Sequence, residues 1–95
     1  MTNEKMSFDA HIKDWQIIEV NESDIHGKFL YGTVVEDRKG RFKHGDYIFT
    51  SSIVKYDEDN NLIITLNSVY KLSGSGKHIT CTLYEASNLK IYGSL

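Results

Sequence analysis

Apolar and polar residues alternate along most of the chain, a pattern typical of β-strands with one buried face. From Trp15 onward, β-branched and aromatic residues gather in short runs between polar clusters. Turns rich in Asp, Asn, Ser or Gly separate these runs, and residues 86–95 fit either one helical turn or a terminal strand. We expect strands at residues 15–20, 28–37, 46–57, 62–72 and 79–85.

Two adjacent strands in the middle of the chain give the clearest hairpin. The segment 46–57 has apolar residues on both faces, which indicates a central strand or a strand of a small barrel. In the segment 62–72 the alternation is regular, places Leu66 on the apolar face and is broken only by Ser68. Gly32, inside the preceding strand, marks a bulge or a sharp bend.

These elements predict an all-β fold, with one short helix as an option at the C-terminal end. The first choice is a small five-stranded antiparallel barrel of the SH3-like type, and a strongly bent meander is the alternative. With 95 residues, of which 40% are hydrophobic, the chain suffices for one core. We expect a single β domain over 14–95, preceded by a partly ordered N-terminal tail over 1–13.

Composition narrows the classes of function. A formal net charge of −2 argues against a dedicated nucleic-acid-binding protein, which usually carries a basic field over one face. The single cysteine, Cys81, excludes an internal disulfide, and its place in a strand predicts a small buried apolar side chain. The N-terminal residues lack the apolar core of a signal peptide, and no run approaches the roughly 20 apolar residues of a membrane helix. We therefore expect a cytoplasmic protein without membrane contact.

A basic segment between two predicted strands is the clearest candidate site. Residues 37–47 hold four of the eleven Lys and Arg residues, namely Arg38, Lys39, Arg41 and Lys43. One interpretation is a solvated hairpin loop, partly neutralised by its acidic flanks. The other is a binding loop for an acidic protein face or for nucleic acid, with aromatic residues nearby. We expect Phe42, inside this segment, to fold back as a core plug.

The sequence contains no catalytic or metal-binding signature. The four histidines fall on four different predicted segments, and one cysteine cannot complete a zinc motif. Paired carboxylates at 36–37 point to opposite faces of a strand, and those at 57–59 belong to a turn. We expect no enzymatic activity, no metal and no cofactor.

Small polar residues lie in the middle of the two central strands. Thr50 and Ser52 share one strand face, and Thr65 and Asn67 share a face of the next strand. Three interpretations stay open: a solvated sheet face, a ladder of cross-strand hydrogen bonds, or a flat polar surface for a partner.

The segments RFKHGDYIFTSSIV and ITLNSVYKL together resemble a pattern of short uncharacterised bacterial proteins assigned to a domain of unknown function. In that pattern an Arg-Phe pair and a Gly-Asp pair precede a strand with Thr-Ser, and a strand with Asn-Ser and Tyr follows. The matching residues here are Arg41, Phe42, Gly45, Asp46, Thr50, Ser51, Ile53, Thr65, Asn67, Ser68 and Tyr70. The resemblance implies no activity, substrate or cofactor, and it marks residues 28–72 as the central unit of the fold.

The leading hypothesis is a non-enzymatic protein-interaction module that covers a surface on a larger protein. A stoichiometric inhibitor that is encoded by a phage or mobile element and blocks a host protein is one version of it. Its contacts are expected at Arg38, Lys39, Arg41, Lys43, Tyr47 and Tyr56. The alternative is a nucleic-acid-binding small β barrel that uses the basic residues 38–43. A homodimer formed through an edge strand is the third interpretation.

Overall fold

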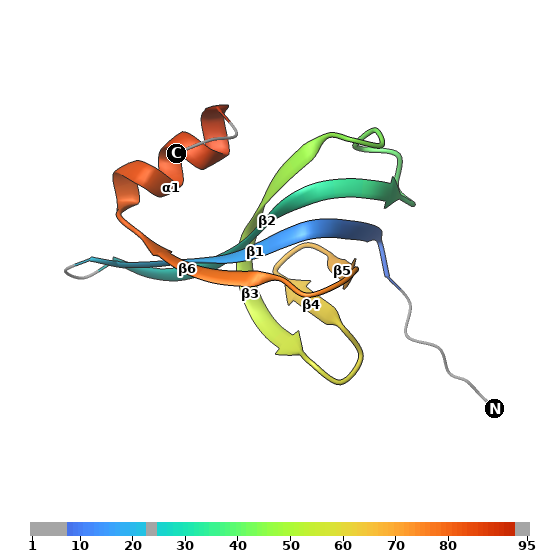
Figure 1. The fold of residues 1–95 in the computed structure, drawn as a ribbon, viewed down its shortest axis with the longest axis horizontal. Coiled ribbons are helices and arrows are strands. Elements are labelled where there is room, and N and C mark those ends of the chain that lie inside the picture. The colour runs from blue at the N-terminus through green and yellow to red at the C-terminus, as the bar shows by residue number, and fades with distance from the viewer. Residues whose placement is uncertain (1–7, 23–24, 93–95) are drawn as a thin grey trace.

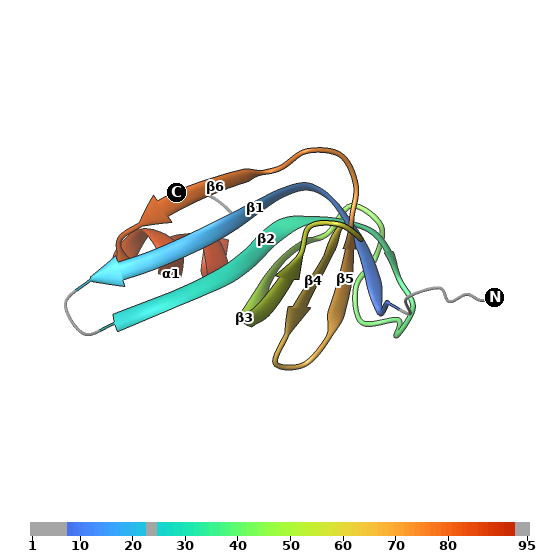
Figure 2. The ribbon, with the colours of Figure 1, turned by 90° about the horizontal axis from the view of Figure 1, so that it is seen from below.

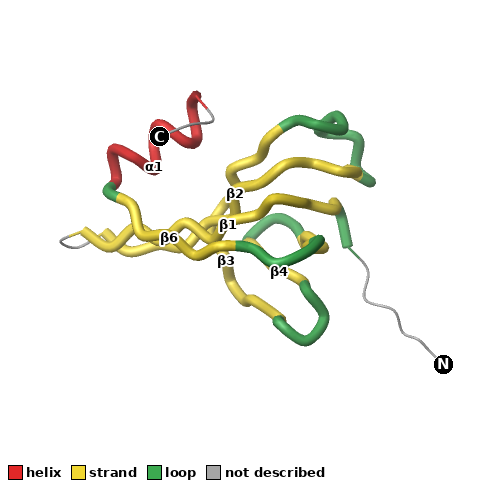
Figure 3. Tube along the Cα trace, viewed as in Figure 1, coloured by secondary structure: helices red, strands yellow, loops and turns green. Residues whose placement is uncertain are grey.

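The structure is a computed structural model that describes residues 8–22 and 25–92. Six strands precede one helix in this part of the chain (Figures 1 and 3). Their bounds are β1 (Ala10–Glu22), β2 (Ile25–Asp37), β3 (Tyr47–Asp57), β4 (Leu62–Thr65), β5 (Val69–Leu72), β6 (Lys77–Cys81) and α1 (Leu83–Tyr92). The mostly β fold with one short helix, predicted from the alternation, is confirmed.

Five of the described strands close into a ring, and the sixth lies outside it. Each strand from β1 to β4 pairs antiparallel with the next, and β5 returns to pair in parallel with β1. β6 pairs in parallel with the second half of β1. The sequence predicted five antiparallel strands. The sixth strand and the two parallel pairings are additions, because alternation shows which face a residue occupies but not which strand lies beside it.

β1 belongs both to the ring and to a sheet that extends beyond it. Ala10–Ile12 pair with β5, whereas Gln16–Val20 pair with β6. β2 accompanies β1 along both parts, so β1, β2 and β6 reach together past the ring (Figure 2). We call this extension the outer sheet.

The first strand is longer than the alternation predicts. β1 begins at Ala10 rather than at residue 15, because Ala10 and Ile12 are both buried inside the ring. Residues 10–13 of the predicted tail therefore belong to the sheet, and residues 1–7 lie outside the described part of the chain.

A bulge bends β1 between its two halves. The β1–β2 register shifts between Lys13 and Gln16, and Asp14 adopts a positive φ of 51°. Gly32 of β2 faces this bulge, where a Cβ atom would lie 2.5 Å from Cγ2 of Ile12. The bulge predicted at Gly32 is therefore present, but the bulged residues, between Lys13 and Gln16, lie on β1 and not on β2.

Two hydrophobic clusters lie on opposite faces of β1, so the adjacent Ile17 and Ile18 belong to different clusters. Phe42 packs against the ring cluster, as predicted for a core plug. The ring cluster contains Ala10, Ile12, Trp15, Ile17, Leu30, Val34, Ile48, Ile63, Tyr70 and Leu72. The second cluster, between α1 and the outer sheet, contains Ile18, Val20, Cys81, Ala86 and Leu89.

The single strand predicted over 62–72 is two strands, β4 and β5, separated by a tight turn. The Thr65 hydroxyl organises the turn, because it donates to the carbonyl of Ser68 at 3.1 Å and accepts the backbone N–H groups of Asn67 and Ser68. The turn rotates Leu66 out of the apolar face, and 70% of this residue is exposed. Ser68, the one residue that broke the predicted alternation, lies in this turn.

α1 begins directly after β6 because its first turn is capped. The Thr82 hydroxyl accepts the backbone N–H of Glu85, and the Glu85 carboxylate accepts the backbone N–H of Thr82. The strand predicted over 79–85 therefore ends at Cys81, and Ala86 and Leu89 bury one side of the helix against the outer sheet. Within the described residues, no helix is long and apolar enough to span a bilayer.

Candidate functional site

The basic loop, residues 38–46 between β2 and β3, is built around Asp37. The Asp37 side chain is 0% exposed, and its carboxylate accepts the backbone N–H groups of Lys39, Arg41 and Phe42 at 3.1, 2.6 and 2.9 Å. Burial raises the pKa of the Asp37 carboxyl, but the hydrogen bonds from Arg41 and from these backbone groups outweigh it and hold the pKa below the usual value. The carboxylate therefore fixes the path of the loop.

Arg41, one of the predicted contact residues, lies at the surface, but its guanidinium is already bound by groups of the protein. Its guanidinium contacts the Asp37 carboxylate through Nε and Nη2, each at 3.2 Å. Its Nη1 donates to the Ser68 hydroxyl at 2.9 Å, across the turn between β4 and β5. Arg41 thus connects the basic loop to the ring, a structural role that its position in the sequence does not reveal.

Two of the other loop cations also contact neighbouring residues. The guanidinium of Arg38 lies 3.7 Å from the centre of the Phe8 ring, and Lys39 Nζ lies 3.7 Å from a carboxylate oxygen of Asp9. Within the described residues, the Lys43 ammonium has no hydrogen-bond or ion-pair partner. The basic loop therefore presents less free positive charge than its composition indicates.

The two predicted contact tyrosines lie at opposite ends of β3. The Tyr47 hydroxyl donates to the carbonyls of Lys90 and Ile91, each at 3.3 Å, at the C-terminal end of α1. Tyr56 packs edge-on against Trp15, with ring centres 5.8 Å apart. The structure therefore does not bring Tyr47, Tyr56 and the loop cations together into one surface.

The small polar residues of the central strands contribute mostly to internal hydrogen bonds. Thr50 is buried, accepts the backbone N–H of Leu30 at 3.0 Å and donates to the carbonyl of Ser51. Asn67, in the turn between β4 and β5, donates from Nδ2 to the Ser51 hydroxyl of β3 at 3.3 Å, which is a bond from a turn to a strand and not the predicted ladder between two strands. Ser51 and Ser52 of β3 remain half-buried.

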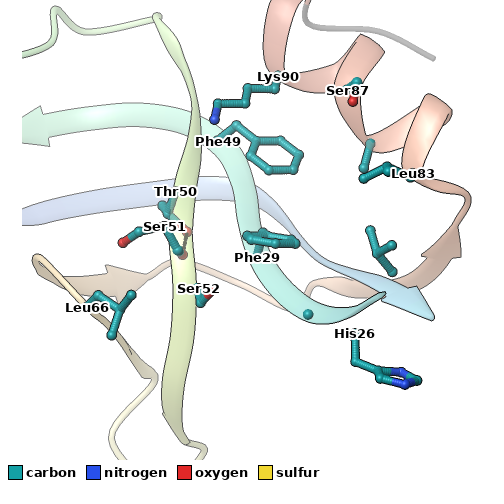
Figure 4. A pocket seen from close by; sticks show the side chains of 13 residues that line it. His26, Phe29, Phe49, Thr50, Ser51, Ser52, Leu66, Leu83, Ser87 and Lys90 are labelled. Carbon is teal, nitrogen blue, oxygen red and sulfur yellow. Dashed lines mark hydrogen bonds between the residues drawn. The ribbon is translucent and has the colours of Figure 1, made fainter. Parts of the chain in front are cut away.

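A groove lies between α1 and the neighbouring strands β2 and β3 (Figure 4). Its volume is about 360 Å³, within the range of pockets that bind small ligands or partner side chains. We call it the helix groove. It is lined by Val20, His26, Gly27, Phe29, Phe49, Thr50, Ser51, Ser52, Leu66, Leu83, Ala86, Ser87 and Lys90.

Apolar side chains form the floor and both rims of the helix groove. Phe29 and Phe49 lie side by side on the floor, with ring centres 5.4 Å apart. A Cβ atom on Gly27 would lie 2.9 Å from the Phe29 ring. The absence of a side chain at Gly27 therefore gives the Phe29 ring the space that it occupies. Leu66, 70% exposed, and Leu83, 44% exposed, rise at the rims.

Sequence reasoning missed the helix groove because both rim leucines were placed in strands. Leu66 leaves the apolar face only because of the turn that Thr65 organises. Leu83 belongs to a helix, and the motif Thr82-x-x-Glu85 that caps this helix is present in the sequence. Two features of the sequence therefore indicated these departures from strand structure: Ser68 interrupts the alternation beside Leu66, and the capping motif surrounds Leu83.

A second groove, of about 320 Å³, lies on the other face of the outer sheet. Trp15 and Tyr56 supply its aromatic wall, and the Trp15 indole N–H donates to the carbonyl of Gly74 at 3.1 Å. Lys28, Lys77 and Glu58 bring charges of both signs to its lining. The described residues hold no group of three His, Cys, Asp or Glu side chains suited to a metal ion.

Comparison with known protein families gives a match over most of the chain. Residues 3–88 match the family described as a domain of unknown function, DUF6957. The chain belongs to the DUF6957 family. The resemblance drawn from residues 41–72 is thereby confirmed. Neither a curated protein nor a solved structure gives a significant match. The DUF6957 match covers the whole ring, β6 and the first half of α1.

Proposed function

We propose that this DUF6957 protein is a non-enzymatic interaction module that binds another protein through the helix groove. The observation that carries the proposal is the pair of exposed leucines, Leu66 and Leu83, at the rims of a groove floored by Phe29 and Phe49. Fully burying a leucine side chain stabilises a complex by about 1.5–3 kcal/mol. A partner that covers these rims therefore gains binding energy where the protein itself leaves apolar surface in water.

The outer face of α1 extends this apolar surface. Tyr84 is 76% exposed and Ile91 is 64% exposed, and Ile91 follows Tyr84 by seven positions, which is about two helical turns. Both therefore point to the same side, away from the buried Ala86 and Leu89. Tyrosine is favoured at protein interfaces because its ring is apolar and its hydroxyl stays hydrated.

The basic loop supports the alternative function, a nucleic-acid-binding β barrel, less well. Phosphate binding draws on free cations, and Arg41, Arg38 and Lys39 already contact groups of the protein. An inhibitor encoded by a phage or mobile element is one form that a protein-binding module can take, and this finer assignment stays a prediction.

Capture from host lysate with matched variants tests the proposal. The tagged wild type is compared with Leu66→Asp, which places a charge in the groove, and with Val54→Asp, which makes the same kind of change on β3 outside it. Val54 is 62% exposed, so it matches Leu66 in accessibility. We expect one protein to be retained in stoichiometric amount after nuclease treatment by the wild type and Val54→Asp, and at least tenfold less by Leu66→Asp.

Three other results would contradict this assignment. Equal loss of the partner in Leu66→Asp and Val54→Asp indicates non-specific binding to exposed apolar side chains. Loss in the double variant Arg38→Glu/Lys43→Glu, with Leu66→Asp unaffected, moves the site to the basic loop. Loss of all binding on nuclease treatment favours the nucleic-acid function. Thermal unfolding followed by circular dichroism confirms that each variant is folded.

A further inference from the structure

One charged side chain gives the helix groove a polarity. Lys90 lies in the last turn of α1, and Figure 4 shows its side chain directed from the helix toward Phe49. Within the described residues, its ammonium has no hydrogen-bond or ion-pair partner. An ammonium group at the rim of an apolar groove can bind the anionic group of a ligand whose neighbouring apolar side chain fills the groove.

The charges around the groove leave this cation uncompensated. The lining contains no Asp or Glu among the described residues, although the whole chain carries a formal net charge of −2. Glu22 and Glu85 are at the other end of α1, where they accept the backbone N–H groups of Leu83 and Thr82. The groove therefore has the opposite sign from the chain as a whole, and a basic partner segment is disfavoured.

Hydroxyl groups complete the polar part of the lining. Ser51 and Ser52 lie on β3, and Ser87 lies across the groove on α1 (Figure 4). The Ser51 oxygen accepts a hydrogen bond from Asn67, which leaves its O–H as a donor. Carboxylates and backbone carbonyls accept such hydrogen bonds, so these donors favour the same kind of partner as Lys90.

We infer that the partner segment carries an Asp or Glu beside a large apolar side chain, with the carboxylate on Lys90 and the apolar group between Leu66 and Leu83. This inference rests on the proposed function, because it names the chemistry of a protein that occupies the helix groove. It also gives the complex an orientation, with the acidic end of the segment at the C-terminal end of α1.

A displayed library of random heptapeptides, selected on the immobilised full-length protein, tests the inference. Leu66→Asp serves as the groove-blocked reference. We expect the wild type to enrich peptides with Asp or Glu within two residues of Leu, Ile, Phe, Trp or Tyr, and Leu66→Asp not to enrich them. The best peptide is then synthesised and its Kd is measured by titration calorimetry.

Charge reversal makes the test specific. Lys90→Glu is expected to weaken the selected peptide at least tenfold and, in a new selection, to shift enrichment from acidic to basic peptides. Lys55→Glu, the same change at an exposed lysine of β3 outside the groove, should leave the Kd within twofold. Neither position is buried, so both variants are expected to fold.

The outcomes separate this inference from the proposed function. The inference of an acidic partner is overturned if the groove enriches neutral or basic peptides, or if Lys90→Glu leaves the Kd unchanged. In both cases the proposal that the helix groove binds a protein is retained. No enrichment above the Leu66→Asp reference overturns the inference. A concentration-dependent dimer of the wild type that Leu66→Asp abolishes makes a second copy the occupant and also overturns it. Loss of the lysate partner on nuclease treatment contradicts the proposed function itself.

Discussion

Asp37 is the residue on which the basic loop depends. Its carboxylate has no access to solvent and accepts three backbone N–H groups together with the Arg41 guanidinium. A buried anion is stable only when such donors surround it, and donors arranged around it are left unpaired when it is removed. The sequence shows four cations in this loop, but one anion, the Asp37 carboxylate, orders it.

Replacing this anion by its neutral amide tests that role. Asp37→Asn puts an NH₂ group where the Arg41 and backbone donors point, so hydrogen bonds are lost and donors face each other. We expect the free energy of unfolding at pH 7 to fall by about 2–4 kcal/mol. Urea unfolding measures the loss, and Asp59→Asn, at an exposed turn position, should change stability by less than about 0.5 kcal/mol.

The same carboxylate predicts how stability depends on pH. Its pKa in the folded protein is lower than the ordinary value of 3.8, which applies to the unfolded chain. Its contribution is therefore complete above the ordinary value and disappears as the pH falls through the lower, folded pKa. The difference in unfolding free energy between wild type and Asp37→Asn should be constant from pH 7 to about pH 5 and shrink below about pH 4. A difference that grows toward acid contradicts this role.

Gly32 tests the bend of β1. A Cβ atom there would lie 2.5 Å from Ile12 Cγ2 and 3.1 Å from the backbone carbonyl of Lys13, so the bulge itself has to move. We expect Gly32→Ala to destabilise the protein by about 2–3 kcal/mol in urea unfolding. Gly40→Ala provides the comparison, because no atom lies within 4 Å and only its positive φ of 71° is strained. It should cost about 1 kcal/mol.

At the scale of elements, α1 depends on its first turn. Thr82 and Glu85 satisfy each other's backbone N–H groups, so Thr82→Ala should cost about 1 kcal/mol. Hydrogen exchange of α1 amides is expected to accelerate while exchange in β2 and β3 stays unchanged. Thr80→Ala, at an exposed position of β6, is the matched control. Uniform acceleration across the ring would show that α1 does not open separately.

The elements that the sequence predicted well are those whose burial follows from alternation alone. β2 and β3 have the predicted extent to within a few residues, because a strand between two neighbours must bury alternate side chains. The prediction was wrong for β4, β5 and α1 because hydroxyl groups set the ends of these elements. The Thr65 hydroxyl ends β4 and the Thr82 hydroxyl begins α1, and a pattern of apolar and polar residues does not show such hydrogen bonds. The basic loop was located by composition. Its engagement with Phe8, Asp9 and Ser68 depends on contacts between distant segments, which one sequence does not show.

At the scale of the whole molecule, two clusters of unequal size share the β1–β2 hairpin. Among the described residues, ten buried side chains form the ring cluster and five form the cluster under α1. We expect the layer of α1 and β6 to open at a lower free energy than the ring, because less apolar surface holds it. Native-state hydrogen exchange in low urea measures the two values.

A pair of core truncations checks this order. Leu89→Ala, in the smaller cluster, should accelerate exchange of α1 amides and cost about 2–3 kcal/mol. Ile63→Ala, in the ring, should cost about 3–4 kcal/mol and accelerate exchange in all elements together. Identical exchange patterns in the two variants would mean that the molecule unfolds only as one unit.

The place of β1 between early and late strands has a consequence for protein synthesis. β1 pairs on one edge with β2, which follows at once, and on the other edge with β5 and β6, near the end of the chain. A nascent chain can form the β1–β2 hairpin early, but the second edge of β1 is not fully paired until both β5 and β6, which ends at Cys81, have emerged from the ribosome. Such an edge invites pairing between neighbouring nascent chains. Growth temperature and the supply of chaperones that bind nascent chains should therefore govern the yield of this protein more than the stability of its finished fold.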